Sequence, residues 1–427
     1  LPLVMVLLPL LFAKIPSALL VWALAVALVD LALACVLLGF FDYGEAGFQF
    51  VDRFVWIEPL GISYNVGVDG ISLWMLLLAT LMGPVAVLAS WKFLDGQPNL
   101  NARPYLFFLL LLETGVLGVF AAVDLVLFFI FWEAMLVPMY FIIAIWGHEN
   151  RIYAAIKFFL FTQISGLLML LAIIGLYFVH GQNTGVYTFD YRQLLGTAMS
   201  ETTAMWLMLG FLIAFLVKLP AVPVHTWLPD AHVEARTGGS VILAAIMLKI
   251  GGYGFLRFSL PITPDASSEL DWLIILMSLV AVVYIGFVAL VQEDMKKLLA
   301  WSSIGQVGYI VMGIAAMSNM GWTAAAWHSV AHLLFKGMLF LAVAGVIMRT
   351  GPRNMYETGG LIKKMPATFI TVLIGIIALS GVPPLTGFAG KWLLYQAMIE
   401  KGWYLQAGMA FFSSTIAFLY CFRLIHS

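Results

Sequence analysis

The sequence predicts an all-α, polytopic membrane protein with thirteen transmembrane helices. Of its 427 residues, 63% are hydrophobic and 10% are charged, whereas soluble globular domains carry about 25% charged residues. The apolar residues gather in runs long enough to cross a bilayer core of about 30 Å. Two of these runs are interrupted by proline and glycine next to a lysine. The net charge of −1 argues against nucleic acid as a partner.

The predicted spans follow from the need for roughly 20 apolar residues in each transmembrane helix. In chain order they cover residues 1–13, 17–41, 71–92, 104–123, 125–147, 152–180, 204–228, 239–259, 270–292, 297–317, 322–348, 366–397 and 403–425. A polar stretch at 42–70 is the longest predicted loop outside the membrane.

The distribution of basic residues predicts the orientation of the spans, because cytoplasmic loops carry an excess of lysine and arginine. If successive spans alternate in direction across the membrane, the loops on one side of it carry twelve basic residues, namely Lys14, Lys92, Arg103, Arg151, Arg236, Lys296, Lys297, Arg349, Arg353, Lys363, Lys364 and Arg423. The other side receives three, namely Arg53, Arg192 and Lys401. The sequence therefore predicts that the twelve residues face the cytoplasm and that the N-terminus lies on the opposite, outer side of the membrane.

The two interrupted runs lie in the seventh and twelfth spans. They are VKLPAVPVHTWLP at 217–229, with Lys218, and LSGVPPLTGFAGKW at 379–392, with Lys391. A helix break at membrane depth is tolerated only where the backbone lines an enclosed or wet cavity. The breaks are five spans apart, and an odd offset predicts an inverted repeat. The alternative is a pair of packing kinks with no role in transport.

This repeat sets the predicted division of the chain. Residues 1–103 form spans one to three with the loop, 104–259 form repeat one and 260–427 form repeat two. The repeats contain spans four to eight and nine to thirteen.

Charged residues inside the apolar runs indicate a function, since each costs at least about 2.5–3.5 kcal/mol to insert. Glu133 lies in the fifth span, Lys218 beside the first break and Lys249 near the centre of the eighth span. A buried lysine next to a carboxylate can take up or release a proton when its neighbour changes. A Glu133–Lys218 pair that only fixes packing is the alternative, but it leaves Lys249 and Lys391 unexplained.

The run AWHSVAHLLFKGMLF places His328, His332 and Lys336 on one helix face, at positions i, i+4 and i+8. Imidazoles titrate near neutral pH and can relay protons between lysines. Metal binding and ordinary hydrogen-bonded burial are the alternatives, although no third metal ligand is apparent. His225, near the end of the seventh span, is predicted to serve the relay or line its pathway.

Three further residues are weaker candidates. Glu113 is a second mid-span carboxylate, and Lys157 lies close enough to a span end to extend its amine toward water. His232 falls in a predicted cytoplasmic turn, where it either caps a helix or lines an access path.

No cofactor motif is present in the sequence. It has no phosphate-binding glycine loop, no cysteine cluster and no haem ligand pair, and its two cysteines, Cys35 and Cys421, lie in apolar runs. We therefore expect no cofactor and no metal in this chain, and energy for transport from an ion gradient or a partner subunit.

Long blocks of the sequence resemble the M subunit of NADH:quinone oxidoreductase (complex I), the chain 4 type. They are FFIFWEAMLVPMYFIIAIWGHENRIYAAIKFFLFTQISGLLMLL at 128–171 and LVKLPAVPVHTWLPDAHVEARTGGSVILAAIMLKIGGYGFLRF at 216–258. EDMKKLLAWSSIGQVGYIVMG at 293–313 is similar to antiporter-like subunits in general. The resemblance implies a fourteen-helix fold with two inverted five-helix repeats, in a bacterial cytoplasmic membrane.

By motif position, the resemblance implies that Glu133 and Lys218 respond to a neighbouring subunit. Protons would then pass through Lys249 and the span-eleven histidines to Lys391. The implied function is proton translocation in a membrane arm, driven by redox chemistry in partner subunits, with antiporter-like neighbours on both sides.

Two features leave the host complex open. Arg236 stands where the family usually has proline, and the span-eleven run is also similar to Mrp cation/proton antiporters. The alternatives are therefore an Mrp-like exchanger, with Na+ as a second ion, and the membrane subunit of an inorganic-carbon uptake complex.

Overall fold

The computed structural model of the chain describes residues 16–95 and 101–426. Within these residues, eleven helices are long and apolar enough to cross a membrane, and Pro366–Ser380 is a shorter apolar helix. The predicted first span, 1–13, lies outside the described residues. The described chain falls into two compact units. Unit 1 runs up to Val217 and includes Tyr253–Ser267, and unit 2 holds Lys218–Gly252 and the chain from Ser268.

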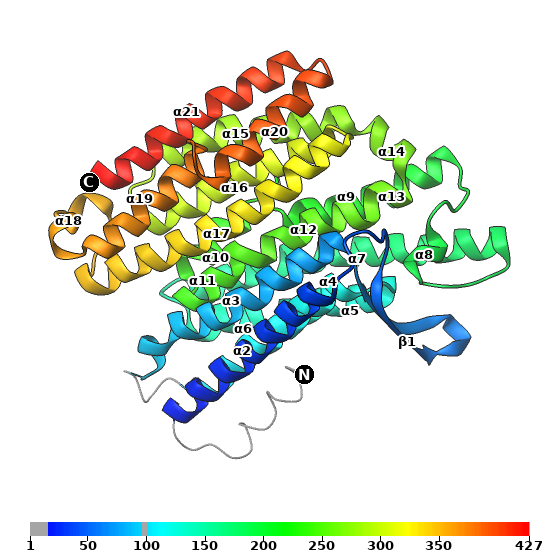
Figure 1. Ribbon diagram of the computed structural model, residues 1–427, viewed down its shortest axis with the longest axis horizontal. Helices are drawn as coiled ribbons and strands as arrows, with labels where there is room; N and C mark the ends of the chain where they lie inside the picture. Colours follow the sequence, from blue (N-terminus) through cyan, green and yellow to red (C-terminus); the bar gives the residue numbers. More distant parts are fainter. Residues whose placement is uncertain (1–15, 96–100, 427) are drawn as a thin grey trace. The chain divides into compact units, whose positions relative to one another are not determined.

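Unit 1 is built mainly from long helices (Figure 1). They are α2 (Pro16–Phe40), α3 (Gly70–Asp95), α4 (Ala102–Ala121), α5 (Leu125–Ala134), α6 (Leu136–Trp146), α7 (Arg151–Thr184) and α9 (Glu201–Lys218), with the short α8 (Tyr191–Leu194). Asp124 fixes the start of α5 by accepting hydrogen bonds from the N–H groups of Val126 and Leu127. Gly185, with φ of 75°, ends α7 in the left-handed conformation.

A single predicted span, 125–147, is divided into α5 and α6 at Met135. Pro138 has no N–H to donate to the carbonyl of Ala134, four residues earlier, so the hydrogen-bond ladder is interrupted here. The two backbone hydrogen bonds that Met135 makes are long. Its N–H donates to the carbonyl of Phe131 at 3.3 Å, and its carbonyl accepts from the N–H of Met139 at 3.4 Å. The break comes two residues after Glu133.

The stretch at 42–70 contains a β-hairpin, so the all-α prediction was wrong there. Strand β1 (Gln49–Ile57) pairs antiparallel with β2 (Ile62–Val68), joined by the short helix η1 (Glu58–Leu60). Both strands are rich in aromatic and β-branched residues, which favour strands. Figure 1 shows the hairpin extending past the ends of α4 and α5.

Buried polar side chains attach this hairpin to the helices of unit 1. The backbone N–H and hydroxyl of Ser63 donate to Asp124 Oδ2, at 3.0 Å and 3.2 Å. The side-chain amide of Asn65 donates to Asp190 Oδ2 at 3.0 Å, and Arg192 forms a salt bridge with Asp190 at 2.8 Å. Burial would raise the pKa of Asp190, but the hydrogen bonds and charge of Arg192 outweigh burial and hold that pKa below its usual value.

We expect Asp190→Asn to destabilise unit 1 by roughly 1–3 kcal/mol at pH 6, because Arg192 loses its charged partner. A lowered folded-state pKa means that the ionised carboxylate stabilises the fold above the unfolded pKa of about 3.9, and that this stability is lost as pH falls below it. Thermal unfolding of the protein in detergent between pH 3 and pH 6 measures this. The difference between wild type and variant should shrink toward pH 3, and a constant difference would contradict the assignment. Asp52→Asn, on exposed β1, is the matched control.

Unit 2 is also helical. Its elements include α10 (Trp227–Glu234), α15 (Asp271–Leu290), α16 (Met295–Ala315), α17 (Asn319–Thr350), η4 (Met355–Glu357), α18 (Leu361–Lys364), α19 (Pro366–Ser380), α20 (Thr386–Glu400) and α21 (Tyr404–His426). Helix α17 packs against α16, α19 and α20 (Figure 1). Asp294 caps α16 by accepting from the N–H groups of Lys296 and Lys297.

One helical stretch, Thr237–Ile262, passes from unit 2 into unit 1. Its parts are α11 (Thr237–Ile242), the π-helical turn η2 (Leu243–Met247), α12 (Leu248–Gly254), the π-helical turn η3 (Phe255–Ser259) and α13 (Leu260–Ile262). A short helix, α14 (Pro264–Glu269), follows it.

Both predicted helix breaks are present. Helix α9 ends at Lys218 and α10 begins at Trp227, and α19 ends at Ser380 before α20 begins at Thr386. Each break contains proline, which supplies no backbone N–H. The breaks therefore leave carbonyl groups at helix ends free to accept hydrogen bonds from side chains.

Candidate proton-transfer site

Glu133 is half-buried in unit 1 at the end of α5. Its carboxylate lies against Gly166 of α7, so closely that a methyl group added at Gly166 would overlap Glu133 Oε1. Gly166 thus leaves the space that the carboxyl group occupies. Glu133 and Lys218 belong to different units, so their pairing stays a prediction.

Lys218 is 2% exposed and is the last residue of α9. A cation at this end is stabilised by the negative end of the helix dipole. His225 lies within the break that follows, is 7% exposed and places its ring 5.6 Å from that of Trp301. The break thus brings a lysine and a histidine into the interior over a short stretch of chain.

Lys249 is held by neutral acceptors. Its Nζ lies 2.6 Å from the carbonyl oxygen of Ala244 and 2.6 Å from His332 Nδ1. Ala244 belongs to the π-helical turn η2, whose wider hydrogen bonding rearranges the carbonyls next to Lys249. The sequence predicts Lys249 and His332 as separate candidates, and the structure brings their nitrogens into hydrogen-bond contact.

The two histidines of α17 extend this contact along one helix face. The rings of His328 and His332 are 6.5 Å apart, and these residues are 2% and 0% exposed. Gly390 lets α20 pack closely here, since a methyl group there would lie 3.1 Å from His328 Cβ. The residue after Gly390 is Lys391.

Lys391 depends on the second helix break. Its Nζ donates to the carbonyls of Leu379 and Ser380, at 3.2 Å and 3.3 Å, which are exposed by the end of α19. It also donates to Ser414 Oγ at 3.2 Å. The break thus provides acceptors for a lysine that is 2% exposed.

Tyr309 lies between His328 and Lys391 and was not predicted. Its ring is 5.7 Å from that of His328, and Lys391 Nζ stands 4.6 Å from its centroid. Its hydroxyl is 3.1 Å from Ser414 Oγ, which is 2.8 Å from the hydroxyl of Tyr395. Hydroxyl groups therefore continue the polar series beyond Lys391.

Lys336 occupies the other end of the histidine face. It is fully buried and donates to the carbonyl of Leu299 at 2.8 Å and to Ser302 Oγ at 2.5 Å. In chain order along α17, His328, His332 and Lys336 therefore meet α20, α12 and α16 in turn. We call Lys249, His332, His328 and Lys391, with Lys336 as a branch, the lysine–histidine row.

The lysines of this row have no acidic partner. Among the described residues, no carboxylate lies within salt-bridge distance of Lys249, Lys336 or Lys391. In the same part of the chain, no group of three or more His, Cys, Asp or Glu side chains could hold a metal ion. The row is thus a series of buried bases whose lysines hydrogen-bond to neutral groups.

Two of the weaker candidates belong to unit 1, and the third, His232, belongs to unit 2. Glu113 is 5% exposed and faces α3 in unit 1, and half-buried Lys157 stands over the ring of Tyr153 at 5.5 Å. His232 is fully buried in unit 2 and stacks on Phe340 at 4.6 Å, one turn beyond Lys336. Its burial is inconsistent with a solvated helix cap.

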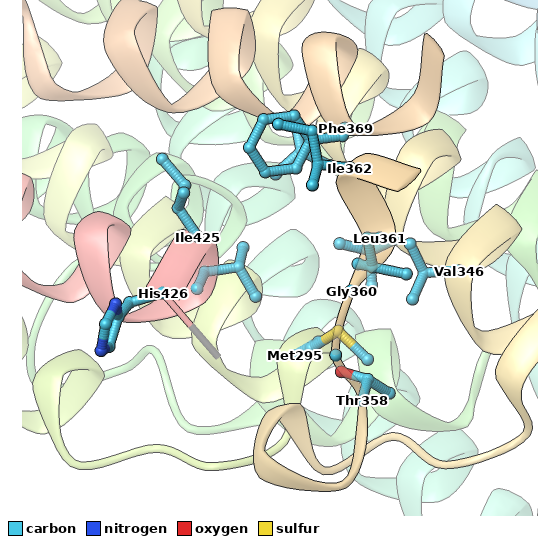
Figure 2. A pocket seen from close by; sticks show the side chains of 13 residues that line it. Met295, Val346, Thr358, Gly360, Leu361, Ile362, Phe369, Ile425 and His426 are labelled. Atoms are coloured by element: carbon cyan, nitrogen blue, oxygen red, sulfur yellow. The ribbon is translucent and has the colours of Figure 1, made fainter. Parts of the chain in front are cut away.

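An apolar pocket of about 120 Å³ in unit 2 is separate from the row (Figure 2). It lies among Met295, Val346, Leu361, Phe369 and Ile425. None of its lining residues belongs to the row, and its polar side chains are those of Thr358 and His426.

Comparison with known proteins relates this sequence and fold to one family. A family model described as NADH:quinone oxidoreductase/Mrp antiporter, TM, matches residues 122–417. A second, described as NADH-ubiquinone oxidoreductase chain 4, amino terminus, matches residues 2–119. Together the two models account for most of the chain.

Individual relatives agree with these models. The chain is 42% identical over 379 residues to NADH-quinone oxidoreductase subunit M of Rhodobacter capsulatus, covering 87% of this chain and 72% of the relative. It is 38% identical over 359 residues to F(420)H(2) dehydrogenase subunit M of Methanosarcina mazei, covering 83% and 71%.

Solved structures share the fold. A chain of respiratory complex I from Thermus thermophilus with bound NADH matches with a TM-score of 0.87 at 28% identity, covering 100% of this chain and 88% of that one. A chain of the Mrp complex from Dietzia sp. matches with a TM-score of 0.88 at 25% identity, covering 99% and 77%. The chain therefore belongs to the family of transmembrane subunits shared by NADH:quinone oxidoreductases and Mrp antiporters, and its amino-terminal part is of the chain 4 type.

Proposed function

We propose that this chain is a proton-translocating membrane-arm subunit of a complex I-type NADH:quinone oxidoreductase. The observation that carries the proposal is the lysine–histidine row, in which Lys249 and His332 are in direct hydrogen-bond contact at membrane depth. Buried bases at this spacing can pass a proton by small movements of side chains and water. The relatives named subunit M support the same assignment.

In this proposal Glu133 and Lys218 respond to a neighbouring membrane subunit. Protons pass from Lys218 along the row to Lys391 and then to the hydroxyls of Ser414 and Tyr395. Redox chemistry in partner subunits drives the movement, and this chain supplies no cofactor. Its partners are membrane subunits of the same complex.

The proposal includes the finer features of the fold. In it, the chain has thirteen spans and two inverted five-helix repeats, 104–259 and 260–427, and its N-terminus faces outside the cytoplasm. The two helix breaks, each beside a lysine in its own half, support the repeat. The host membrane is a bacterial cytoplasmic membrane.

Replacing Lys218 or Glu133 with alanine tests the function. We expect either variant to lose proton pumping by about a hundredfold, the lower range for removal of a group that transfers protons. Pumping is measured as dye quenching in vesicles that oxidise NADH with a quinone, with subunit content checked by immunoblotting. Lys363→Ala, in exposed α18, is the control. Full pumping in both site variants would exclude the proposal.

Cation/proton exchange of the Mrp type is the second candidate, favoured by the match to the Mrp complex. Vesicles that contain the protein but receive no electron donor separate the two functions. A sodium-dependent pH change under these conditions supports exchange, whereas proton movement only during NADH oxidation supports the first proposal.

A further inference from the structure

A cavity of about 350 Å³ in unit 1 lies outside the lysine–histidine row. Its walls come from α2, α3, α4 and the hairpin strand β2, with Phe131 of α5. Most lining side chains are apolar, and the polar ones are Asp30, Tyr64, Thr80 and Thr114.

Asp30 is the charged residue of this cavity wall. It is 5% exposed, and its Oδ2 has no hydrogen-bond partner among the residues that the structure describes. An unpartnered carboxylate in an apolar setting is strongly unfavourable, so such a group holds a proton or a ligand instead.

Glu113 is an acidic neighbour of Asp30. The two carboxyl groups are close enough to interact electrostatically, and Glu113 Oε1 also has no hydrogen-bond partner within the described chain. A methyl group at Gly83 would overlap the carboxyl group of Glu113, so this side chain lies against the backbone of α3. Glu133 points instead to α7, so the two glutamates belong to different sites.

The cavity leads from the hairpin end of the helices to Asp30, and Thr114, the residue after Glu113, also lines it. Tyr64 and Val66 of β2 line one end, together with Ala121 at the end of α4. Asp30 lies ten residues before the end of α2 that is next to the hairpin, and Thr80 lies ten residues after the start of α3. Each is thus about 15 Å along its helix from the hairpin. The cavity therefore reaches from the hairpin end of the helices to their middle.

No described base neutralises the pair. The other charged side chains that the structure describes on α2 to α6 are Lys92, Arg103 and Glu133. Lys92 is nine residues from Gly83 and Arg103 ten residues from Glu113, or about 13–15 Å along their helices. Two adjacent carboxyl groups without a cation cannot both be ionised at low cost.

We propose that Asp30 and Glu113 together bind a proton that reaches them through this cavity from the hairpin side of the membrane. This protonation site is separate from the lysine–histidine row, and it stands whether or not the row translocates protons. Thr80 and Thr114 provide hydroxyl groups for water in the path.

Dicyclohexylcarbodiimide tests the proposal in membranes that contain the intact complex. This apolar reagent reacts with a protonated carboxyl group: the acid proton moves to one nitrogen, the carboxyl oxygen bonds to the central carbon, and acyl transfer to the second nitrogen leaves a stable N-acylurea. Mass spectrometry of peptides then identifies the labelled residue. We expect label on Asp30 or Glu113 at neutral pH, declining as pH rises, and none on exposed Asp42.

Variants in the cavity and at Glu113 distinguish a protonation site from carboxyl groups that only pack between helices. Ala34→Phe places a ring in the cavity and should lower the labelling severalfold, whereas Ala32→Phe, on the exposed face of α2, should not. Glu113→Gln removes a repelling charge and should move the loss of Asp30 labelling to lower pH. The proposal is overturned if neither carboxyl group is labelled, or if Ala34→Phe leaves the labelling unchanged.

Discussion

Replacing Lys249 with methionine is expected to lower proton translocation by at least about a hundredfold, because the variant keeps the side-chain length and removes the titratable nitrogen. Lys249 Nζ joins α12 to His332 of α17 through a 2.6 Å contact, and the other ring nitrogen of His332 has no hydrogen-bond partner among the described residues. Methionine fits the apolar surroundings. The fold should therefore remain while the row is interrupted.

Dye quenching during NADH oxidation measures this effect, and retained thermal stability shows that the variant folds. Lys363→Met is the matched control, since it removes an exposed lysine in the same unit. Unchanged pumping in the Lys249 variant would show that protons do not pass through the contact with His332.

Replacing Gly381 with valine is expected to remove most proton translocation. Here the titratable nitrogen of Lys391 remains, but its side chain is displaced. Gly381 has φ of 77°, a conformation that costs a β-branched residue about 1–3 kcal/mol. A Cβ atom there would also lie 2.7 Å from Lys391 Cδ. The lysine would have to leave the carbonyls of Leu379 and Ser380, which hold its amine in place.

Gly402→Val distinguishes backbone strain from displacement of the lysine. Gly402 has φ of 75°, and no atom lies within 4 Å of a Cβ placed there. Both variants should lose comparable thermal stability from the backbone, but only the Gly381 variant should lose pumping. Equal pumping in the two would mean that the position of Lys391 is unimportant.

The long apolar helices could be predicted because membrane insertion imposes a length that the sequence displays directly. Lys218 and Lys391 likewise marked the helix breaks, since a charge beside proline in an apolar run has few structural explanations. The β-hairpin was missed because a criterion of about 20 apolar residues cannot detect strands of 9 and 7 residues.

The partners of the charged residues were harder to predict. Tyr309, Ser302 and Ser414 are ordinary residues for apolar helices, and only packing shows that they meet the lysines. Asp30 did carry a signal, because it is the one charged residue of its span, and the rule that identified Glu133 also applies to it. The π-helical turn next to Lys249 has no local marker such as proline.

The absence of any described carboxylate beside Lys249, Lys336 and Lys391 limits how many of them are charged together. In a medium of low polarity, one ammonium group raises the cost of a second nearby, and no counter-ion offsets it. A proton that arrives at one lysine therefore favours departure of the proton from the next. In the proposed function, the row therefore stores little charge, and its proton occupancy advances in single steps.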